Sequence, residues 1–206
     1  MAIAVTGPLA SGKSTFVEAL GDLGVETVSA DEIVHQLLAS DRETIDAVVR
    51  RFGEVVRAQE GGIDRKALGR EVFGKAEALR DLEELLHPRV REETERRAAD
   101  SGADLFVAEI PLLFEGERGD QFDYTVAITT PDERRRAWAE ERGMGEEQRR
   151  AIEDRQLPGE EKARRADVVV ENDGDLDKLR EQAKVLVDRA LGGRGSVGES
   201  GAEEEK

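Results

Sequence analysis

A glycine-rich segment near the amino terminus constrains the fold more than any other feature of the chain. Residues 7–14 read Gly-Pro-Leu-Ala-Ser-Gly-Lys-Ser, which matches the pattern G-x-x-x-x-G-K-[ST]. Loops of this kind wrap phosphate oxygens with backbone N–H groups, while the lysine reaches the terminal phosphates and the last hydroxyl ligates Mg²⁺. A strand-like run precedes the segment and a helical pattern follows it, so the positive end of a helix dipole would face the anion. We therefore predict a phosphate-binding loop; the alternative is a glycine-rich turn with an incidental lysine.

Short apolar runs alternate with helical stretches along the rest of the chain. This alternation predicts an α/β fold of the P-loop NTPase type, with a five-stranded parallel sheet covered by helices on both faces. A helix is expected from Lys13 to Asp22, a long helical stretch from Asp31 to Asp100 and a last helix from Leu176 to Leu191. Breaks in the long stretch are expected near Ser40, Gly61, Gly74 and Pro88. The predicted strands are Ile3–Thr6, Val25–Ser29, Leu105–Ile110, Tyr124–Thr129 and Val168–Glu171.

Composition narrows the kind of protein. A net charge of −16 disfavours nucleic acid as a partner, and cysteine is absent, which excludes a thiolate nucleophile and Cys-ligated metals. No apolar run approaches the length of a membrane span, and we expect neither a signal peptide nor a membrane partner, which fits a cytoplasmic protein. We expect one domain over residues 1–192 and a disordered acidic tail over 193–206. Oligomeric state does not follow from the sequence.

Two further features favour a kinase over other proteins with such a loop. Asp31 follows the second predicted strand, where a carboxylate can accept the proton of an acceptor hydroxyl; alternatively it caps the next helix. An arginine-rich helical stretch lies between the fourth and fifth strands. It could close as a lid whose arginines neutralise the transferred charge. For any single arginine there, a solvated helix with Glu–Arg pairs is the alternative.

The sequence says less about which nucleotide base the protein recognises. The guanine-reading pattern N-K-x-D is absent, which argues against a GTPase. Asn172-Asp173-Gly174 follows the fifth predicted strand instead. This turn could contact a base through its backbone, or it could be a plain turn.

Several segments in a fixed order resemble the dephospho-coenzyme A kinase family, and together they span the chain to about residue 190. The D-x-x-x-H, L-L-H-P and P-L-L-F-E elements are far more specific than the phosphate loop. The matching segments are Gly7–Thr15, Ser29–His35, Gly62–Leu68, Leu85–Pro88, Ile110–Glu115, Gln156–Pro158, Lys162, Ala166-Asp167 and Asn172–Gly174.

The resemblance implies transfer of the γ-phosphoryl group of ATP to the ribose 3′-hydroxyl of dephospho-CoA, with Mg²⁺, as the final step of coenzyme A synthesis. Residues 32–97 would form a helical lobe on the CoA side, and residues 131–158 would form the lid. The implied catalytic residues are Asp31, Lys13 and Arg142, with Ser14 as a metal ligand. The implied ATP-binding residues are Gly7, Ala10, Ser11, Gly12, Lys13, Ser14, Thr15 and Asn172. The implied substrate-binding residues are Asp31, His35, Arg65, His87 and Leu113.

Some of these residues have simpler explanations. His87 precedes Pro88 and could end or cap a helix. Leu113 belongs to an apolar run that could be core, although the run follows a strand end, where open α/β sheets bind ligands. Glu109, at the end of the third strand, could hold a Mg²⁺ ligand in place without contacting the ion itself.

The chain departs from the family pattern in two places. In the phosphate loop Pro8 and Ala10 replace glycines, so one N–H donor is lost, and Ala10 requires that its position not need a positive φ. In the lid Trp138 stands four residues before Arg142, where the family has a second arginine, and Arg134 to Arg136 are substitutes within reach. The competing hypotheses are another small-molecule P-loop kinase, acting on a nucleoside monophosphate or a sugar acid, and a non-catalytic nucleotide-binding regulator.

Overall fold

The computed structural model describes residues 1–192 of the chain, and the predicted acidic tail at 193–206 lies outside the described residues. The chain divides into two compact units. Of the described residues, the first unit contains 1–27 and 103–192, and the second contains Val28–Gly102. No helix within residues 1–192 has both the length and the apolar character needed to span a membrane.

A parallel sheet organises the first unit. The strands follow the order β2-β3-β1-β4-β5, so β1 lies in the centre. Ile3 of β1 pairs with Val107 of β3 on one side and with Tyr124 of β4 on the other, and β4 pairs in parallel with β5. The strands are β1 (Ala2–Thr6), β2 (Glu26–Ser29), β3 (Phe106–Glu109), β4 (Tyr124–Thr129) and β5 (Val168–Glu171). The predicted fold class is confirmed, and the strand bounds shift by at most one residue.

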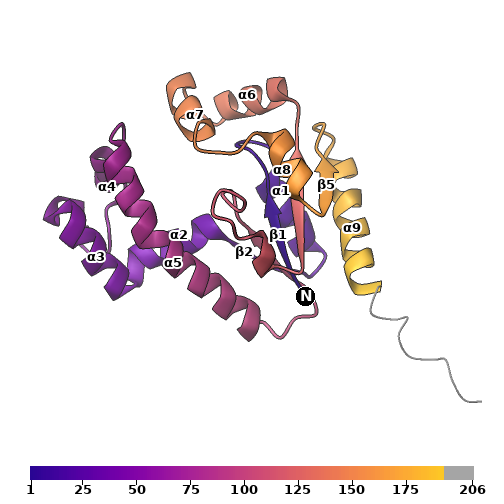
Figure 1. Ribbon diagram of the computed structural model, residues 1–206, viewed down its shortest axis with the longest axis horizontal. Helices are drawn as coiled ribbons and strands as arrows, with labels where there is room; N and C mark the ends of the chain where they lie inside the picture. The colour runs from indigo at the N-terminus through magenta and orange to yellow at the C-terminus, as the bar shows by residue number, and fades with distance from the viewer. Residues whose placement is uncertain (193–206) are drawn as a thin grey trace, which may run out of the picture. The chain divides into compact units, whose positions relative to one another are not determined.

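Helices cover this sheet. The helix α9 lies beside β5 (Figure 1) and also packs against α1, and α8 packs against β4. Two short 3₁₀ helices, η1 (Glu54–Val56) in the second unit and η2 (Gly119–Gln121) in the first, complete the connections. The helices of the first unit are α1 (Lys13–Asp22), α6 (Asp132–Glu141), α7 (Glu146–Glu153), α8 (Gly159–Arg165) and α9 (Leu176–Gly192).

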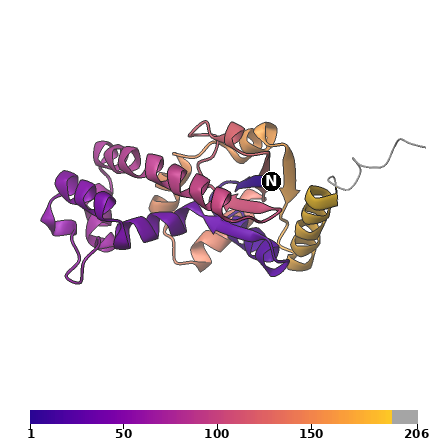
Figure 2. The ribbon, with the colours of Figure 1, turned by 90° about the horizontal axis from the view of Figure 1, so that it is seen from below.

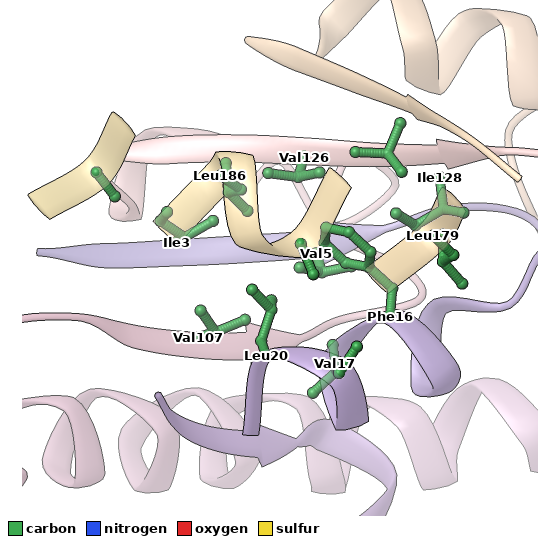
Figure 3. Packing of buried hydrophobic residues seen from close by; sticks show 14 of the residues in the cluster. Ile3, Val5, Phe16, Val17, Leu20, Val107, Val126, Ile128, Leu179 and Leu186 are labelled. Carbon is green, nitrogen blue, oxygen red and sulfur yellow. The ribbon is translucent and has the colours of Figure 1, made fainter. Parts of the chain in front are cut away.

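The core of the first unit explains why the phosphate loop is held at a fixed place. Val5 of β1 and Val126 of β4 face α1 and α9 on one side of the sheet (Figure 3). Phe16 and Leu20 of α1 are fully buried there, and Leu179 of α9 is 1% exposed. Because apolar residues on both sides of the loop are buried in one cluster, the strand before the loop and the helix after it are both anchored.

The second unit is helical and has a core of its own. It contains α2 (Ala30–Ser40), α3 (Arg42–Phe52), α4 (Arg65–Val72) and α5 (Ala76–Asp100). The long helix α5, magenta in Figure 2, packs against α2, α3 and α4. The buried residues at its centre include Leu38, Val48, Val56, Leu68 and Leu86.

One predicted break in this unit is wrong. Pro88 lies inside α5, which continues through it. A proline in a helix interior removes one backbone hydrogen bond and weakens the turn before it. The guanidinium of Arg89 donates to the carbonyl oxygen of Leu85 at 2.9 Å, in that same turn. Packing of α5 against three neighbouring helices outweighs the local preference of proline.

Candidate active site

The phosphate loop connects β1 to α1, as predicted, and both of its motif glycines are required. Gly7 has a φ of 155°, and a Cβ atom there would lie 2.6 Å from the carbonyl oxygen of Ile128. Gly12 has a φ of 85°, is the N-cap residue of α1, and a Cβ atom there would collide with the side chain of Asn172. Any side chain at either position would displace the loop from its neighbours.

Lys13 and Ser14 occupy the first turn of α1. Lys13 is 7% exposed, and its Nζ donates to the carbonyl oxygen of Pro8 at 3.0 Å. The Ser14 hydroxyl donates to Oε1 of Glu109 at 3.0 Å, and Glu109 is the last residue of β3. A lysine, a hydroxyl and a carboxylate therefore meet at the positive end of a helix, which is the set of groups that binds a metal–polyphosphate complex.

The predicted turn after β5 holds the loop in place. Asn172 is 6% exposed, and its Nδ2 donates to the carbonyl oxygen of Ser11 at 3.0 Å. The hydroxyl of Thr130 donates to the same oxygen at 2.9 Å. The Asn172 side chain therefore positions the phosphate loop. The sequence had suggested only a backbone contact with the nucleotide base or a plain turn.

Ala10 contradicts the expectation about its backbone. Its φ is +56°, in the left-handed region, although the sequence required that this position avoid a positive φ. The loop imposes this conformation, because Gly7 and Gly12 fix its ends and the Ser11 carbonyl is bound from two sides. An alanine in this region costs about 1–2 kcal/mol relative to the usual helical conformation.

The predicted lid corresponds to α6, α7 and the connection to α8, and two of its side chains bind one residue of the phosphate loop. The amide oxygen of Gln156 accepts from the N–H of Leu9 at 2.7 Å. Nη1 of Arg135 donates to the Leu9 carbonyl oxygen at 3.2 Å and to Glu153 at 3.0 Å. Glu153 also pairs with Arg149. The two lid helices are therefore linked to each other and to the loop through Arg135.

Arg142, the predicted lid residue, has a different environment from Arg135. It caps the carboxyl end of α6, it is exposed, and its guanidinium forms no ion pair with any of residues 1–192. Arg150, by contrast, pairs with Glu146 one helical turn away. Arg150 therefore fits the alternative of a solvated helix with Glu–Arg pairs, and the catalytic role of Arg142 stays a prediction.

In the second unit, Asp31 lies in the first turn of α2. The N-cap of this helix is Ser29, so the capping alternative for Asp31 is wrong. Asp31 is exposed, and its carboxylate accepts no hydrogen bond from residues 1–192. His35 lies one turn further along the same helix, where i and i+4 side chains share a face. Nη1 of Arg65 lies 2.8 Å from Nδ1 of His35, which makes Nδ1 the acceptor and places the ring proton on Nε2.

The other two predicted substrate residues, His87 and Leu113, lie in contrasting environments. His87 is exposed in the interior of α5, so it neither ends nor caps a helix. Leu113 is fully buried, which favours the core alternative. Both assignments to the substrate site stay predictions.

Three residues that had no predicted role connect segments around the phosphate loop: Lys162, Glu115 and Gln156. Lys162 is fully buried, with its Nζ 2.7 Å from Oε1 of Glu115. Burial lowers the pKa of the Lys162 ammonium, and the hydrogen bond to Glu115 opposes this effect. Gln156 binds Leu9 as described. All three residues belong to the quoted family motifs, but nothing in the local pattern gives their partners.

A phosphate-binding loop on a parallel sheet, followed by an arginine-rich helical pair attached to that loop, defines a P-loop kinase. Comparisons with known proteins narrow the class further. The family profile described as "Dephospho-CoA kinase" matches residues 1–178. The chain belongs to the dephospho-CoA kinase family. It is an ATP-dependent phosphotransferase that acts on a hydroxyl acceptor, and dephospho-CoA is its substrate.

Individual relatives agree with this assignment. The dephospho-CoA kinase of Syntrophotalea carbinolica is 33% identical and covers 94% of this chain and 93% of its own. That of Symbiobacterium thermophilum is 36% identical over 97% of this chain and 85% of its own. Among solved structures, dephospho-CoA kinase from Campylobacter jejuni is similar with a TM-score of 0.65 and 29% identity, and it covers 92% of this chain and 96% of its own.

Proposed function

We propose that the chain uses ATP and Mg²⁺ to phosphorylate the ribose 3′-hydroxyl of dephospho-CoA through the residues predicted from its sequence. The observation that carries this proposal is the meeting of Lys13, Ser14 and Glu109 at the start of α1. The ATP phosphates would bind the backbone N–H groups of the loop, with Lys13 as a point charge on the β- and γ-phosphates. The chain has no cysteine and so needs no disulfide, and we propose the cytoplasm as the place of the reaction.

The residues present fit a Mg²⁺ ion. Mg²⁺ prefers oxygen ligands and in phosphotransfer sites is held by one or two protein oxygens together with phosphate oxygens. Ser14 would be the direct ligand, and Glu109, which already accepts a hydrogen bond from the Ser14 hydroxyl, would orient it. When bound, the ion neutralises charge on the phosphates.

Residues of α2 and α4 would bind the acceptor. Asp31 would accept the proton of the 3′-hydroxyl, which by itself is a weak nucleophile. The Asp31 carboxylate is exposed and accepts no hydrogen bond from residues 1–192, so an acceptor hydroxyl could bind to it. His35 and Arg65, joined at 2.8 Å, would bind substrate beside it. Arg142 would neutralise charge on the transferred group.

Replacement of Asp31 tests this proposal. Asp31→Asn keeps the shape and removes the charge, so turnover should fall by at least about 10² while ATP affinity stays near wild type. Glu32→Gln is the matched control, because Glu32 lies in the same first turn of α2 and is also exposed. Phosphorus NMR of the wild-type product should show the new phosphate at the 3′ position.

Two outcomes would contradict the proposal. An Asp31→Asn variant as active as Glu32→Gln would remove Asp31 as the base. A wild-type protein that is inert on dephospho-CoA but phosphorylates a nucleoside monophosphate or gluconate would remove the substrate.

A further inference from the structure

Lys162 is a charged residue in an unusual place. It lies in the middle of α8 and is fully buried, although lysine is almost never fully buried unless it is paired. Its Nζ donates to the carbonyl oxygen of Pro111 at 2.7 Å and to Oε1 of Glu115 at 2.7 Å. The Thr6 hydroxyl lies 3.5 Å from the same nitrogen. An ammonium group has three donors, and three oxygen atoms surround this one.

These oxygens come from segments that are far apart in the chain. Thr6 is the last residue of β1 and directly precedes the phosphate loop. Pro111 follows β3 by two residues, and β3 ends at Glu109, the partner of Ser14. Glu115 also accepts the backbone N–H of Leu157 at 2.7 Å, in the connection that leads from the lid into α8. The ammonium therefore joins the entry of the phosphate loop, the end of β3 and the exit of the lid.

Stability does not explain this arrangement. Moving two charges out of water costs more than their attraction returns unless every polar atom is satisfied. Oε2 of Glu115 is buried without a hydrogen-bond partner within residues 1–192, so the pair is incompletely satisfied. Apolar residues of similar volume commonly replace such buried pairs without loss of stability. A buried pair of this kind is therefore weak evidence for a role in stability alone.

We propose that Lys162 and Glu115 are positioning residues that fix the root of the lid to the phosphate loop and to the strand end that carries Glu109. The inference rests on the proposed function, because it assigns residues 131–158 the role of a lid. Gln156, directly before Leu157, binds the N–H of Leu9 in the phosphate loop. Displacement of Leu157 would therefore move the Gln156 contact together with the lid.

The expected consequence for the reaction is hydrolysis of ATP without phosphorylation of the acceptor. In the normal reaction the acceptor oxygen bonds to the γ-phosphorus, the bond to the β–γ bridging oxygen breaks, and ADP leaves while the acceptor proton goes to the base. A lid that is misplaced admits water, whose oxygen can attack the same phosphorus, and the products are then ADP and inorganic phosphate. Loss of the Lys162–Glu115 pair should therefore make the protein form more ADP than CoA.

The test is the double variant Lys162→Met/Glu115→Met, which replaces the buried pair by apolar side chains and leaves no unpaired charge. Four quantities are measured: melting temperature, kcat, the KM for ATP, and the ratio of ADP formed to CoA formed. The variant should melt below wild type by only a few degrees, because apolar side chains can replace the charged pair, whereas the Leu157 N–H and the Pro111 carbonyl lose their side-chain partners. Its kcat should fall by about 10-fold to 10²-fold, as expected for a small misplacement, and its ADP to CoA ratio should rise above that of wild type.

Arg165→Met is the matched control. Arg165 lies on the same helix and pairs with Glu161 at 2.8 Å, but its pair is exposed to solvent. This variant should keep the wild-type kcat and ratio. The single variant Lys162→Met leaves Glu115 buried and unpaired, so it should melt lower than the double variant.

The outcomes separate the possibilities. A double variant with wild-type kcat and ratio would overturn the positioning role. A double variant that melts much lower, with activity reduced in proportion to the folded fraction and an unchanged ratio, would show a structural role and overturn it as well. A failure of the proposed function would be visible separately, as a wild-type protein that forms no CoA in the same assay.

Discussion

At the scale of single residues, Ala10 is the one loop residue whose conformation opposes its side chain. Its φ of +56° belongs to a region in which an L-residue brings Cβ close to the following carbonyl oxygen. Glycine has no such conflict, but it has more freedom in the unfolded chain, which offsets part of the gain. The balance should favour glycine at this position.

Ala10→Gly should therefore raise the free energy of unfolding by about 0.5–1 kcal/mol. Urea denaturation followed by circular dichroism measures the change. Ala19→Gly is the matched control, because Ala19 is equally buried at 7% exposure but lies inside α1 with helical geometry. That change should lower stability by about 1 kcal/mol. Equal losses at both positions would show that Ala10 is not strained.

Residues differ in how far the sequence predicts them. Lys13 and Ser14 follow from a local pattern, because the loop chemistry depends on residues that are adjacent in the chain. Lys162 does not, because its partners Thr6 and Glu115 approach it only when the sheet has formed. Ala10 was predicted wrongly for a related reason: contacts to the Ser11 carbonyl from Asn172 and Thr130 impose its conformation.

At the scale of elements, α5 is held by side-chain interactions as well as by packing. Glu93 on this helix binds Arg96 at 2.8 Å and Arg97 at 2.8 Å, three and four residues further along. Hydrogen bonds from these arginines lower the pKa of the Glu93 carboxyl to about 2, from the ordinary value of 4.5. A carboxyl whose pKa is depressed in the folded state stabilises the fold above its unfolded pKa and loses that effect as the pH falls.

Glu93→Gln should lower the free energy of unfolding at pH 7 by about 0.5–1 kcal/mol, the range of partly exposed helical ion pairs. The difference from wild type should shrink as the pH falls below the ordinary carboxyl pKa of 4.5 toward about 2. Glu92→Gln is the control, since Glu92 is exposed on the same helix and belongs to no ion pair within residues 1–192. Thermal unfolding from pH 7 to pH 3 measures both. A difference that does not change with pH would contradict the role of the Glu93 charge.

Elements were predicted well where local pattern and tertiary packing agree. The strands β4 and β5 and the helix α1 have the predicted bounds, because their apolar periodicity is the same periodicity that the core uses. The prediction failed at Pro88, where the local signal and the packing disagree and α5 continues. A sequence pattern contains the preference of proline but not the contacts of α5 with its neighbours.

At the scale of the whole molecule, charge is the property that the sequence gives most directly. The chain has 47 acidic and 31 basic residues, and its net charge is −16. Many of the basic residues are paired with acidic ones, as Arg135 is with Glu153, and the acidic residues in excess have no basic counterpart in the sequence. Such an excess destabilises a compact state through self-repulsion. The order of the strands was not predicted, because it depends on contacts between segments that are distant in the chain.

Salt should therefore stabilise this protein. The Debye length falls from about 30 Å at 0.01 M to about 8 Å at 0.15 M, so repulsion across the molecule is screened more than contacts within an ion pair. We expect the melting temperature to rise by about 2–4 °C between these concentrations, which for a chain of this length corresponds to about 1 kcal/mol. Calorimetry in sodium chloride measures the shift, and choline chloride at the same concentrations is the control for a specific effect of sodium. Glu93→Gln should show a slightly larger rise than wild type, because it lacks a pair that salt weakens. A melting temperature that falls with salt would show that local ion pairs outweigh the repulsion of the net charge.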